Sequence, residues 1–400
     1  KRHKKHPIFE LQRRKITLND RICYLDNAAT SFPKPSAVTR EVARCLRDYC
    51  GNAGRGSHKM SLFAAQKIYE CRELLSSLIG APSPESIAFV PSCTYGLNLI
   101  IKGILRPGDH VILSDMEHNA VWRPIVKLAH DGIITYDVFS ALSQPNGSEK
   151  ELITEIEGKI KRNTRLIICN HQSNICSYSL PIQKIGELCK NYHVLFALDV
   201  AQSIGHYNID MQKMNINFLS APAHKGLYGV QGAGFVAINS AEILDTLIEG
   251  GNGVDSLLPQ MSDLSPERYE VGTLPLPAIV GLYEGAKFVK SIGIDAIRDH
   301  EHELFRYLRD GLLEIGGSTV HLPEFEGNTL SFNIDNHSAE AVCRALDDAN
   351  ICVRGGFHCT ALAHKALKTD NTGTVRVSFG IFNRKSDIDK LLSAVNNFGL

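Results

Sequence analysis

Polar and ionisable side chains follow five apolar runs of this chain, at the points where the runs end. Thr94 follows the run at 86–92, and His118 follows the run at 110–115. Three more runs are followed by Asn174, Asp199, Gln202, His224 and Lys225. Because ligands of α/β proteins bind beyond the carboxyl ends of the strands, we expect these residues to share one site.

The types of these residues indicate a ligand. Thr94 begins a predicted helix, where free N–H groups and the helix dipole favour an anion such as phosphate. Lys225 supplies an amine that can bond covalently to an aldehyde, and Asp199 can keep a pyridine nitrogen protonated. Taken singly, the threonine and the aspartate are explained as helix caps and the lysine as a solvated side chain. Their combination at one sheet edge, with a histidine to stack on the ring, indicates a site for pyridoxal phosphate.

A second reactive group is the thiol of Cys359, which lies between Gly355–Gly356 and a predicted helix, with Arg354 and His358 nearby. Three roles are open to it: a buried apolar group, a metal ligand and a nucleophile. The chain has eleven cysteines but no CxxC pair, so neither a zinc ribbon nor a thioredoxin motif is present. The thiolate is the nucleophilic form of cysteine, and the two glycines allow a mobile loop. We expect no metal site.

The composition is that of an ordinary globular chain. In 400 residues, 43 basic side chains balance 43 acidic ones, so the chain as a whole carries no electrostatic signal for nucleic acid. The basic run at 1–15 could contact an anionic partner, but we interpret it as a solvated extension. No apolar run reaches about 18 residues, and no signal peptide is present. We therefore expect a cytoplasmic protein with free thiols that binds neither a membrane nor nucleic acid.

The order of the expected elements predicts two domains. Helical patterns alternate with apolar runs at 86–92, 110–115, 165–171, 194–200, 217–223 and 232–238. Strands that are apolar throughout and are spaced by helices form parallel sheets covered on both faces. The pattern breaks at 251–275, a Gly-, Pro- and Ser-rich segment. We predict a basic extension at 1–20, a large cofactor-binding domain at 21–268 and a small α+β domain at 269–400 that carries Cys359.

The motifs resemble, in their order along the chain, those of the cysteine desulfurase and selenocysteine lyase family, class V pyridoxal-phosphate enzymes of fold type I. The resemblance runs from "YLDNAATSFPKP" (24–35) to "GTVRVSFGIFNRKSDID" (373–389). Between them lie "CTYGLN", "MEHNAVWRP", "HQSN", "DVAQSIGH", "AHKGLYGVQGAG", "YEVGT" and "RGGFHC". The resemblance implies a large domain with a mostly parallel sheet between helices, a smaller α+β C-terminal domain, and a homodimer with active sites at its interface.

The resemblance also implies a role for each matching residue. Lys225 would bind the cofactor covalently, His118 would stack on its ring, and Cys359 would be the catalytic cysteine. The other residues implied to bind the cofactor are Cys93 (through its backbone amide), Thr94, Asp199, Gln202, His224 and Thr273, the last reaching the cofactor of the other subunit. The residues implied to line the substrate pocket or to bind the substrate are Ala28, Ala29, Asn174, Arg354 and Arg376.

The implied reaction converts L-cysteine to L-alanine and leaves a persulfide on Cys359 for a sulfur-acceptor protein. A selenocysteine lyase, or another pyridoxal-phosphate-dependent C–S lyase, is the alternative within this class of enzyme. A non-catalytic scaffold protein with the same fold is the alternative of another class. The intact set of Lys225, Asp199, His118, Cys359 and Arg376 speaks against the scaffold.

The chain departs from the family pattern in three places. Pro222 occupies the position of a hydroxyl residue, so one phosphate ligand is missing, and Ser220 or water is the candidate replacement. Cys176 and Tyr178 stand where relatives have small residues and threonine, which leaves the identity of the substrate open. The short segment around Cys359 resembles the sub-group with a compact cysteine loop, which often works with a dedicated sulfur acceptor.

Overall fold

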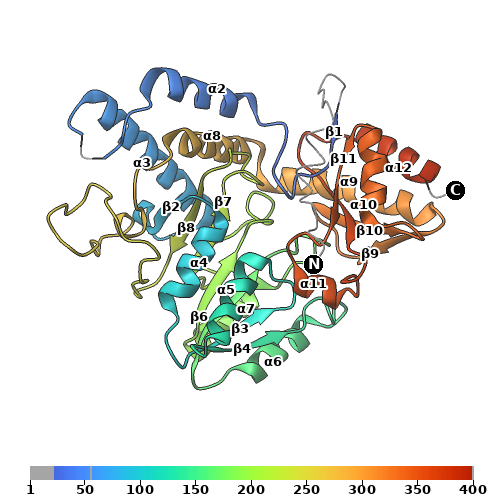
Figure 1. Cartoon of the computed structure of the whole chain (residues 1–400), viewed down its shortest axis with the longest axis horizontal. Coiled ribbons are helices and arrows are strands. Elements are labelled where there is room, and N and C mark those ends of the chain that lie inside the picture. The colour runs from blue at the N-terminus through green and yellow to red at the C-terminus, as the bar shows by residue number, and fades with distance from the viewer. Residues whose placement is uncertain (1–21, 55, 399–400) are drawn as a thin grey trace, which may run out of the picture.

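A seven-stranded sheet forms the larger half of the molecule, in the order β2-β8-β7-β6-β5-β3-β4 (Figure 1). The structure is a computed structural model that describes residues 22–54 and 56–398; the extension predicted at 1–20 lies outside them. The strands are β2 (Ile87–Val90), β3 (His110–Ser114), β4 (Thr135–Phe139), β5 (Thr164–Asn170), β6 (Leu195–Asp199), β7 (Phe218–Pro222) and β8 (Gly234–Ile238). Neighbouring strands are parallel except where β8 is a partner. The predicted α/β class with a mostly parallel sheet is confirmed.

Apolar side chains on both faces bury this sheet between helices. Along β5, Ile167 and Cys169 belong to one core, and Leu166 and Ile168 belong to the core on the opposite face. Successive side chains of a strand alternate in direction, so a strand that is apolar throughout needs cover on both faces. The helices around the sheet are α2 (Ser36–Arg44), α3 (Lys59–Ile79), α4 (Cys93–Ile104), α5 (Asn119–His130), α6 (Glu149–Lys159), α7 (Ile182–Tyr192) and α8 (Leu276–Ile292), with short helical turns at Cys45–Tyr49, Pro84–Ser86 and Glu267–Tyr269.

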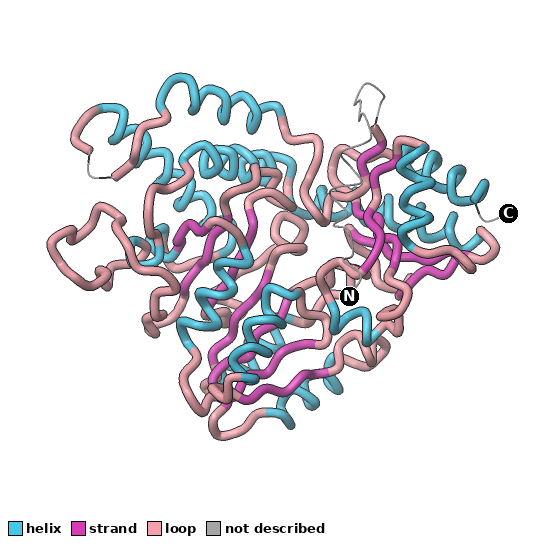
Figure 2. Tube along the Cα trace, viewed as in Figure 1, coloured by secondary structure: helices cyan, strands magenta, loops and turns pink. Residues whose placement is uncertain are grey.

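The smaller half of the molecule carries the C-terminal part of the chain (Figure 2). Its antiparallel sheet has the order β12-β13-β10-β9. These strands are β9 (Ser318–His321), β10 (Thr329–Ile334), β12 (Arg354–Gly356) and β13 (Thr374–Ser378). A two-stranded parallel pair joins β1 (Cys23–Tyr24) to β11 (Ile351–Cys352). The helices of this half are α9 (Ile294–Glu314), α10 (Ala339–Asp348), α11 (Ala361–Ala366) and α12 (Lys385–Phe398).

The hydrophobic cores of the two halves do not follow the order of the chain. Cys23 and Leu25 pack with Phe305 and Phe332 in the core of the smaller half. Leu276, from α8, belongs instead to a core of the large sheet. The division at 268/269 stays a prediction, and the cores alone would group α8 with the large sheet. Among the residues that the structure describes, no helix combines the length and the apolar character needed to cross a membrane.

Candidate active site

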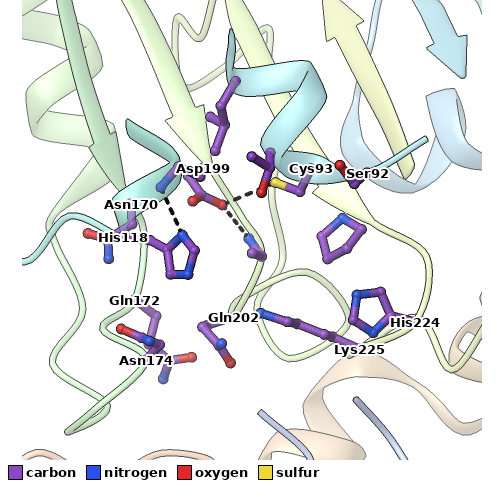
Figure 3. Close-up of a pocket in the computed structure, with 15 residues that line it drawn as sticks. Ser92, Cys93, His118, Asn170, Gln172, Asn174, Asp199, Gln202, His224 and Lys225 are labelled. Carbon is purple, nitrogen blue, oxygen red and sulfur yellow. Dashed lines mark hydrogen bonds between the residues drawn. The ribbon is translucent and has the colours of Figure 1, made fainter. Parts of the chain in front are cut away.

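A cavity of about 570 Å³, measured with its open mouth, lies at the carboxyl ends of the parallel strands (Figure 3). The predicted site residues that line it are Cys93, Thr94, His118, Asn174, Asp199, Gln202, His224 and Lys225. The other residues that line it are Ser92, Leu97, Ala120, Asn170, Gln172, Ala201 and Pro222. The sheet edge therefore brings together side chains that are up to 133 positions apart, from Ser92 to Lys225.

Lys225 and Asp199 influence each other electrostatically in this cavity. Asp199 ends β6, opposite Asn170 of β5 in the ladder, and is 4% exposed. Burial raises the pKa of Asp199, while the N–H of Ala201 at 2.8 Å and the charge of Lys225 oppose that rise. Burial lowers the pKa of Lys225, while Asp199 opposes that change. The lysine is thereby brought closer to the neutral amine, which is the form that acts as nucleophile or base.

His118 caps α5 and presents its ring to the cavity. Its Nδ1 accepts a hydrogen bond from the N–H of Ala120 at 3.0 Å, which assigns the proton of the neutral ring to Nε2. Burial and, after it, repulsion from Lys225 lower the pKa of His118 to about 4. The imidazole is therefore neutral at neutral pH. It lies on the side of the cavity opposite His224 (Figure 3).

The N-terminus of α4 forms the other end of the cavity. Ser92 caps this helix by accepting a hydrogen bond from the N–H of Tyr95 at 3.2 Å, and the side chain of Thr94 is exposed. His224 lies on the same side as Ser92 (Figure 3), and its buried Nδ1 has no hydrogen-bond partner in the described part of the chain. The first N–H groups of a helix have no partner within it. This end is therefore suited to bind a phosphate group.

Ser220 does not replace the hydroxyl that is missing at Pro222. The Ser220 side chain is fully buried and donates to the backbone oxygen of Cys93 at 3.2 Å. Ser220 is not among the residues that line the cavity, whereas Pro222 is. The prediction that Ser220 replaces the missing phosphate ligand is therefore wrong. Ser92 is the serine that lines this end of the cavity.

Cys176 and Tyr178 do not line the cavity. Both belong to the apolar core of the large sheet. The ring of Tyr178 packs edge-on against Phe325, with 4.7 Å between the ring centroids. Cys176 and Tyr178, whose types leave the identity of the substrate open, therefore face a core and not the cavity.

Arg354 and Arg376 stand opposite each other on β12 and β13, and both bind the carboxylate of Asp26. The nitrogen–oxygen distances are 2.7 Å from Arg354 and 2.9 Å from Arg376. Arg376 is 3% exposed and also donates to the backbone oxygen of Asn174 at 3.2 Å. Its buried Nε has no hydrogen-bond partner among the described residues. A guanidinium with an unpaired N–H beside a cavity residue is suited to bind the carboxylate of a ligand.

Cys359 is exposed and follows β12. The side-chain amide of Asn174, which lines the cavity, donates to the backbone oxygen of His358 at 2.8 Å. This hydrogen bond joins the cysteine segment to the cavity. Within the described ranges, no group of three or more His, Cys, Asp or Glu residues could hold a metal ion.

Gly355 and Gly356 do not form a free hinge beside this cysteine. Both lie in β12 and pair with β13. A Cβ at Gly355 would lie 2.8 Å from Sγ of Cys343 in α10, and Gly356 has a φ of 112°. These glycines are explained by close packing and by a left-handed backbone conformation. The two glycines therefore do not provide the hinge of the mobile loop that the sequence predicts.

The remaining predicted residues lie outside the cavity lining. The backbone oxygen of Ala28 accepts a hydrogen bond from Nε2 of Gln202 at 3.1 Å, and Ala29 follows it in the chain. Thr273 is exposed and does not line the cavity of its own chain.

Sequence reasoning missed four polar residues of the site. Ser92, Asn170 and Gln172 line the cavity, and Asp26 binds both arginines. Ser92 and Asn170 could have been found because they directly precede Cys93 and the "HQSN" motif. Asp26 lies inside the quoted "YLDNAAT" motif, but its partners are 328 and 350 positions away, so nothing local indicates them.

A half-buried lysine and a buried aspartate lie at the strand ends beside a helix N-terminus, which agrees with a class V aminotransferase-type site. The sequence profile of the family described as aminotransferase class-V matches residues 23–391. A probable cysteine desulfurase of Pyrococcus abyssi is 30% identical over 97% of each chain, and one of Methanothermobacter thermautotrophicus is 32% identical over 95% of each. The apo structure of a cysteine desulfurase from Thermococcus onnurineus is similar, with a TM-score of 0.86, 27% identity and 94% of each chain covered. The chain belongs to the cysteine desulfurase family of class V aminotransferases.

Proposed function

We propose that this chain is a pyridoxal-phosphate-dependent cysteine desulfurase, which converts L-cysteine to L-alanine and leaves a persulfide on Cys359. One observation carries the proposal: Asn174 lines the cavity of Lys225 and Asp199 and also binds the backbone of the cysteine segment at 2.8 Å. The membership of the family supports the same activity.

The residues of the cavity fit pyridoxal phosphate. The orphan Nδ1 of His224, the hydroxyls of Ser92 and Thr94 and the N-terminus of α4 would hold its phosphate. His118 would lie against its ring, and Asp199 would face its pyridine nitrogen. Lys225 would hold it covalently. The cofactor, when bound, withdraws the electron pair released at the α-carbon of the substrate.

The chain's own groups bind the substrate and move its protons. Arg376 would bind the substrate carboxylate through its buried Nε, and Asn174 would support it from the cavity wall. Nζ of Lys225 would take the α-proton, because burial favours its neutral form. His118, neutral and protonated at Nε2, is a second group that can carry a proton near the ring.

Sulfur transfer requires the thiolate of Cys359. This thiolate attacks the sulfur of L-cysteine, an S–S bond forms, and the C–S bond breaks. The electron pair of the broken bond stays with the β-carbon, which takes up a proton and becomes the methyl group of L-alanine. The sum is L-cysteine and one thiol giving L-alanine and one persulfide, so no external oxidant or reductant is needed.

Selenocysteine and other C–S substrates are the alternatives that Cys176 and Tyr178 raise, and both residues lie in a core rather than in the cavity lining. The homodimer, in which Thr273 would reach the neighbouring cofactor, and the sulfur-acceptor protein stay proposals. So does the location in the cytoplasm.

The function is tested with L-cysteine and the purified, cofactor-loaded protein. We expect one L-alanine per L-cysteine consumed when an acceptor thiol is supplied, and, when it is withheld, one added sulfur atom on the peptide that contains Cys359. Selenocysteine and a thioether substrate run in parallel separate the desulfurase from the lyase alternatives. Alanine from selenocysteine alone would overturn the proposal, and so would a protein that binds the cofactor but turns over none of the three substrates.

Restoring a hydroxyl at Pro222 is expected to strengthen cofactor binding. Pro222 lines the cavity at the end of β7, and a hydrogen bond to a charged group contributes about 1.5–3 kcal/mol, which corresponds to roughly tenfold or more in affinity. Pro222→Ser should therefore lower the dissociation constant of pyridoxal phosphate about tenfold, as measured by equilibrium dialysis of the resolved protein. Pro222→Ala is the matched control, and equal affinities of the two variants would contradict the expectation.

A further inference from the structure

The segment that carries Cys359 has an unusual backbone conformation. His358 and Cys359 have φ values of 46° and 58°. These values lie in the left-handed region, which costs free energy for residues other than glycine. Two successive residues in this region persist only where surrounding contacts hold them.

Hydrogen bonds from the cavity side hold both residues. The backbone oxygen of His358 accepts from the amide of Asn174 at 2.8 Å. The backbone oxygen of Cys359 accepts from the N–H of Asn119 at 2.8 Å. Asn119 directly follows His118 and begins α5. The cysteine is thus exposed, but its backbone is fixed to two elements that line the cavity.

The hydroxyl of Thr360 completes this arrangement. Thr360 is fully buried, and its Oγ1 lies 2.7 Å from Oδ1 of Asn174 and 3.1 Å from the backbone oxygen of His358. The hydroxyl has one proton, and the shorter contact assigns it to Oδ1 of Asn174. A chain of hydrogen bonds therefore runs from Thr360 through the amide of Asn174 to the backbone oxygen of His358. The hydroxyl fixes the amide of Asn174 with its oxygen toward Thr360 and its nitrogen toward His358.

The same asparagine also connects to the substrate side. Its backbone oxygen accepts from Nη1 of Arg376 at 3.2 Å. Asn174 is therefore hydrogen-bonded both to the segment that carries the nucleophile and to the arginine proposed to bind the substrate carboxylate.

We propose that Thr360 is a positioning residue, which holds the Cys359 segment against Asn174 so that the thiol is placed for attack before the substrate binds. This inference rests on the proposed function. It assigns to Thr360 a role in sulfur transfer and none in the binding of the cofactor or in the removal of the α-proton, because among the described residues its hydroxyl has polar contacts only with the cysteine segment and Asn174.

Two reactions of the holoenzyme separate these roles. Alanine formation from L-cysteine needs the thiol of Cys359, whereas exchange of the α-proton of L-alanine with D₂O needs Lys225 and the substrate site but no thiol. We expect Thr360→Val to lower kcat for alanine formation about tenfold, the equivalent of one lost hydrogen bond. The exchange rate at saturating L-alanine and the cofactor absorbance should stay within about twofold. Thr360→Ser, which keeps the hydroxyl, should recover the rate.

Matched variants decide the outcome. Thr164 is another buried threonine, hydrogen-bonded to His110 at 2.8 Å at the start of β5, so Thr164→Val reports the general cost of removing a buried hydroxyl. Thr360→Ala serves where the valine variant does not fold. Equal losses in both reactions, or no loss in either, would overturn the role of Thr360. A wild-type protein that exchanges L-alanine but makes no alanine from L-cysteine would instead overturn the proposed function, and the inference with it.

Discussion

Replacing Cys359 with serine is expected to reduce alanine formation from L-cysteine by roughly a factor of 10³ or more. Serine keeps the size of the side chain, but its hydroxyl does not ionise near neutral pH and so provides no thiolate to attack sulfur. The exposure of Cys359 lets the thiol reach a substrate and then an acceptor. The measurement is alanine release, combined with mass spectrometry of the Cys359 peptide after incubation with L-cysteine.

The same variant should keep the reactions that do not need the thiol. Cofactor absorbance and α-proton exchange of L-alanine should match those of the wild type, because Lys225 and Asp199 are unchanged. Cys50 is the other exposed cysteine among the described residues, and Cys50→Ser is therefore the control, with full activity expected. A persulfide on any cysteine other than Cys359, or undiminished alanine formation in Cys359→Ser, would disprove the assignment of the nucleophile.

Strand prediction from the sequence worked where strands are buried on both faces. Each apolar run from 86 to 238 became one strand of the large sheet, because a parallel sheet between helices requires apolar residues on both faces. The missed strand, β4, lies at the edge and reads "TYDVF", with an exposed Thr135 and a half-buried Asp137. The antiparallel direction of β8 was equally hidden, because composition does not record the direction of a strand.

The residues predicted from the strand ends line one cavity, and their roles there stay predictions. The sequence does not indicate residues whose position depends on strand register or on distant contacts. Ser220 and Pro222 are two residues apart on β7, about 6.6 Å along a strand, and α4 covers the first but not the second. Which position of β7 can contact a phosphate therefore depends on how far α4 extends over the sheet. The hydrogen bond from Thr360 to Asn174 joins residues that are 186 positions apart, and no local pattern indicates it.

Replacing Lys225 with alanine is expected to remove covalent attachment of the cofactor and to lower turnover by roughly a factor of 10⁴ or more. Lys225 lines the cavity, and burial lowers its pKa toward the neutral amine that both covalent bonding and proton removal require. A loaded protein is treated with borohydride, digested and analysed for the modified peptide. In the wild type the modification should lie on Lys225 alone, and in Lys225→Ala it should be absent.

A second lysine makes this test selective. Lys34 donates to the backbone oxygen of His224 at 2.9 Å, and burial lowers its pKa to about 8. Lys34 is therefore a second amine that is partly neutral near physiological pH. It lies beside His224, the residue that directly precedes Lys225. Only position distinguishes the two, since Lys225 lines the cavity and is influenced by the charge of Asp199, while Lys34 is outside the lining. In Lys34→Ala, the modified Lys225 peptide should still be found. A wild-type modification that lies on the Lys34 peptide, and that is lost in Lys34→Ala, would show that proximity to Asp199 does not select the reactive lysine.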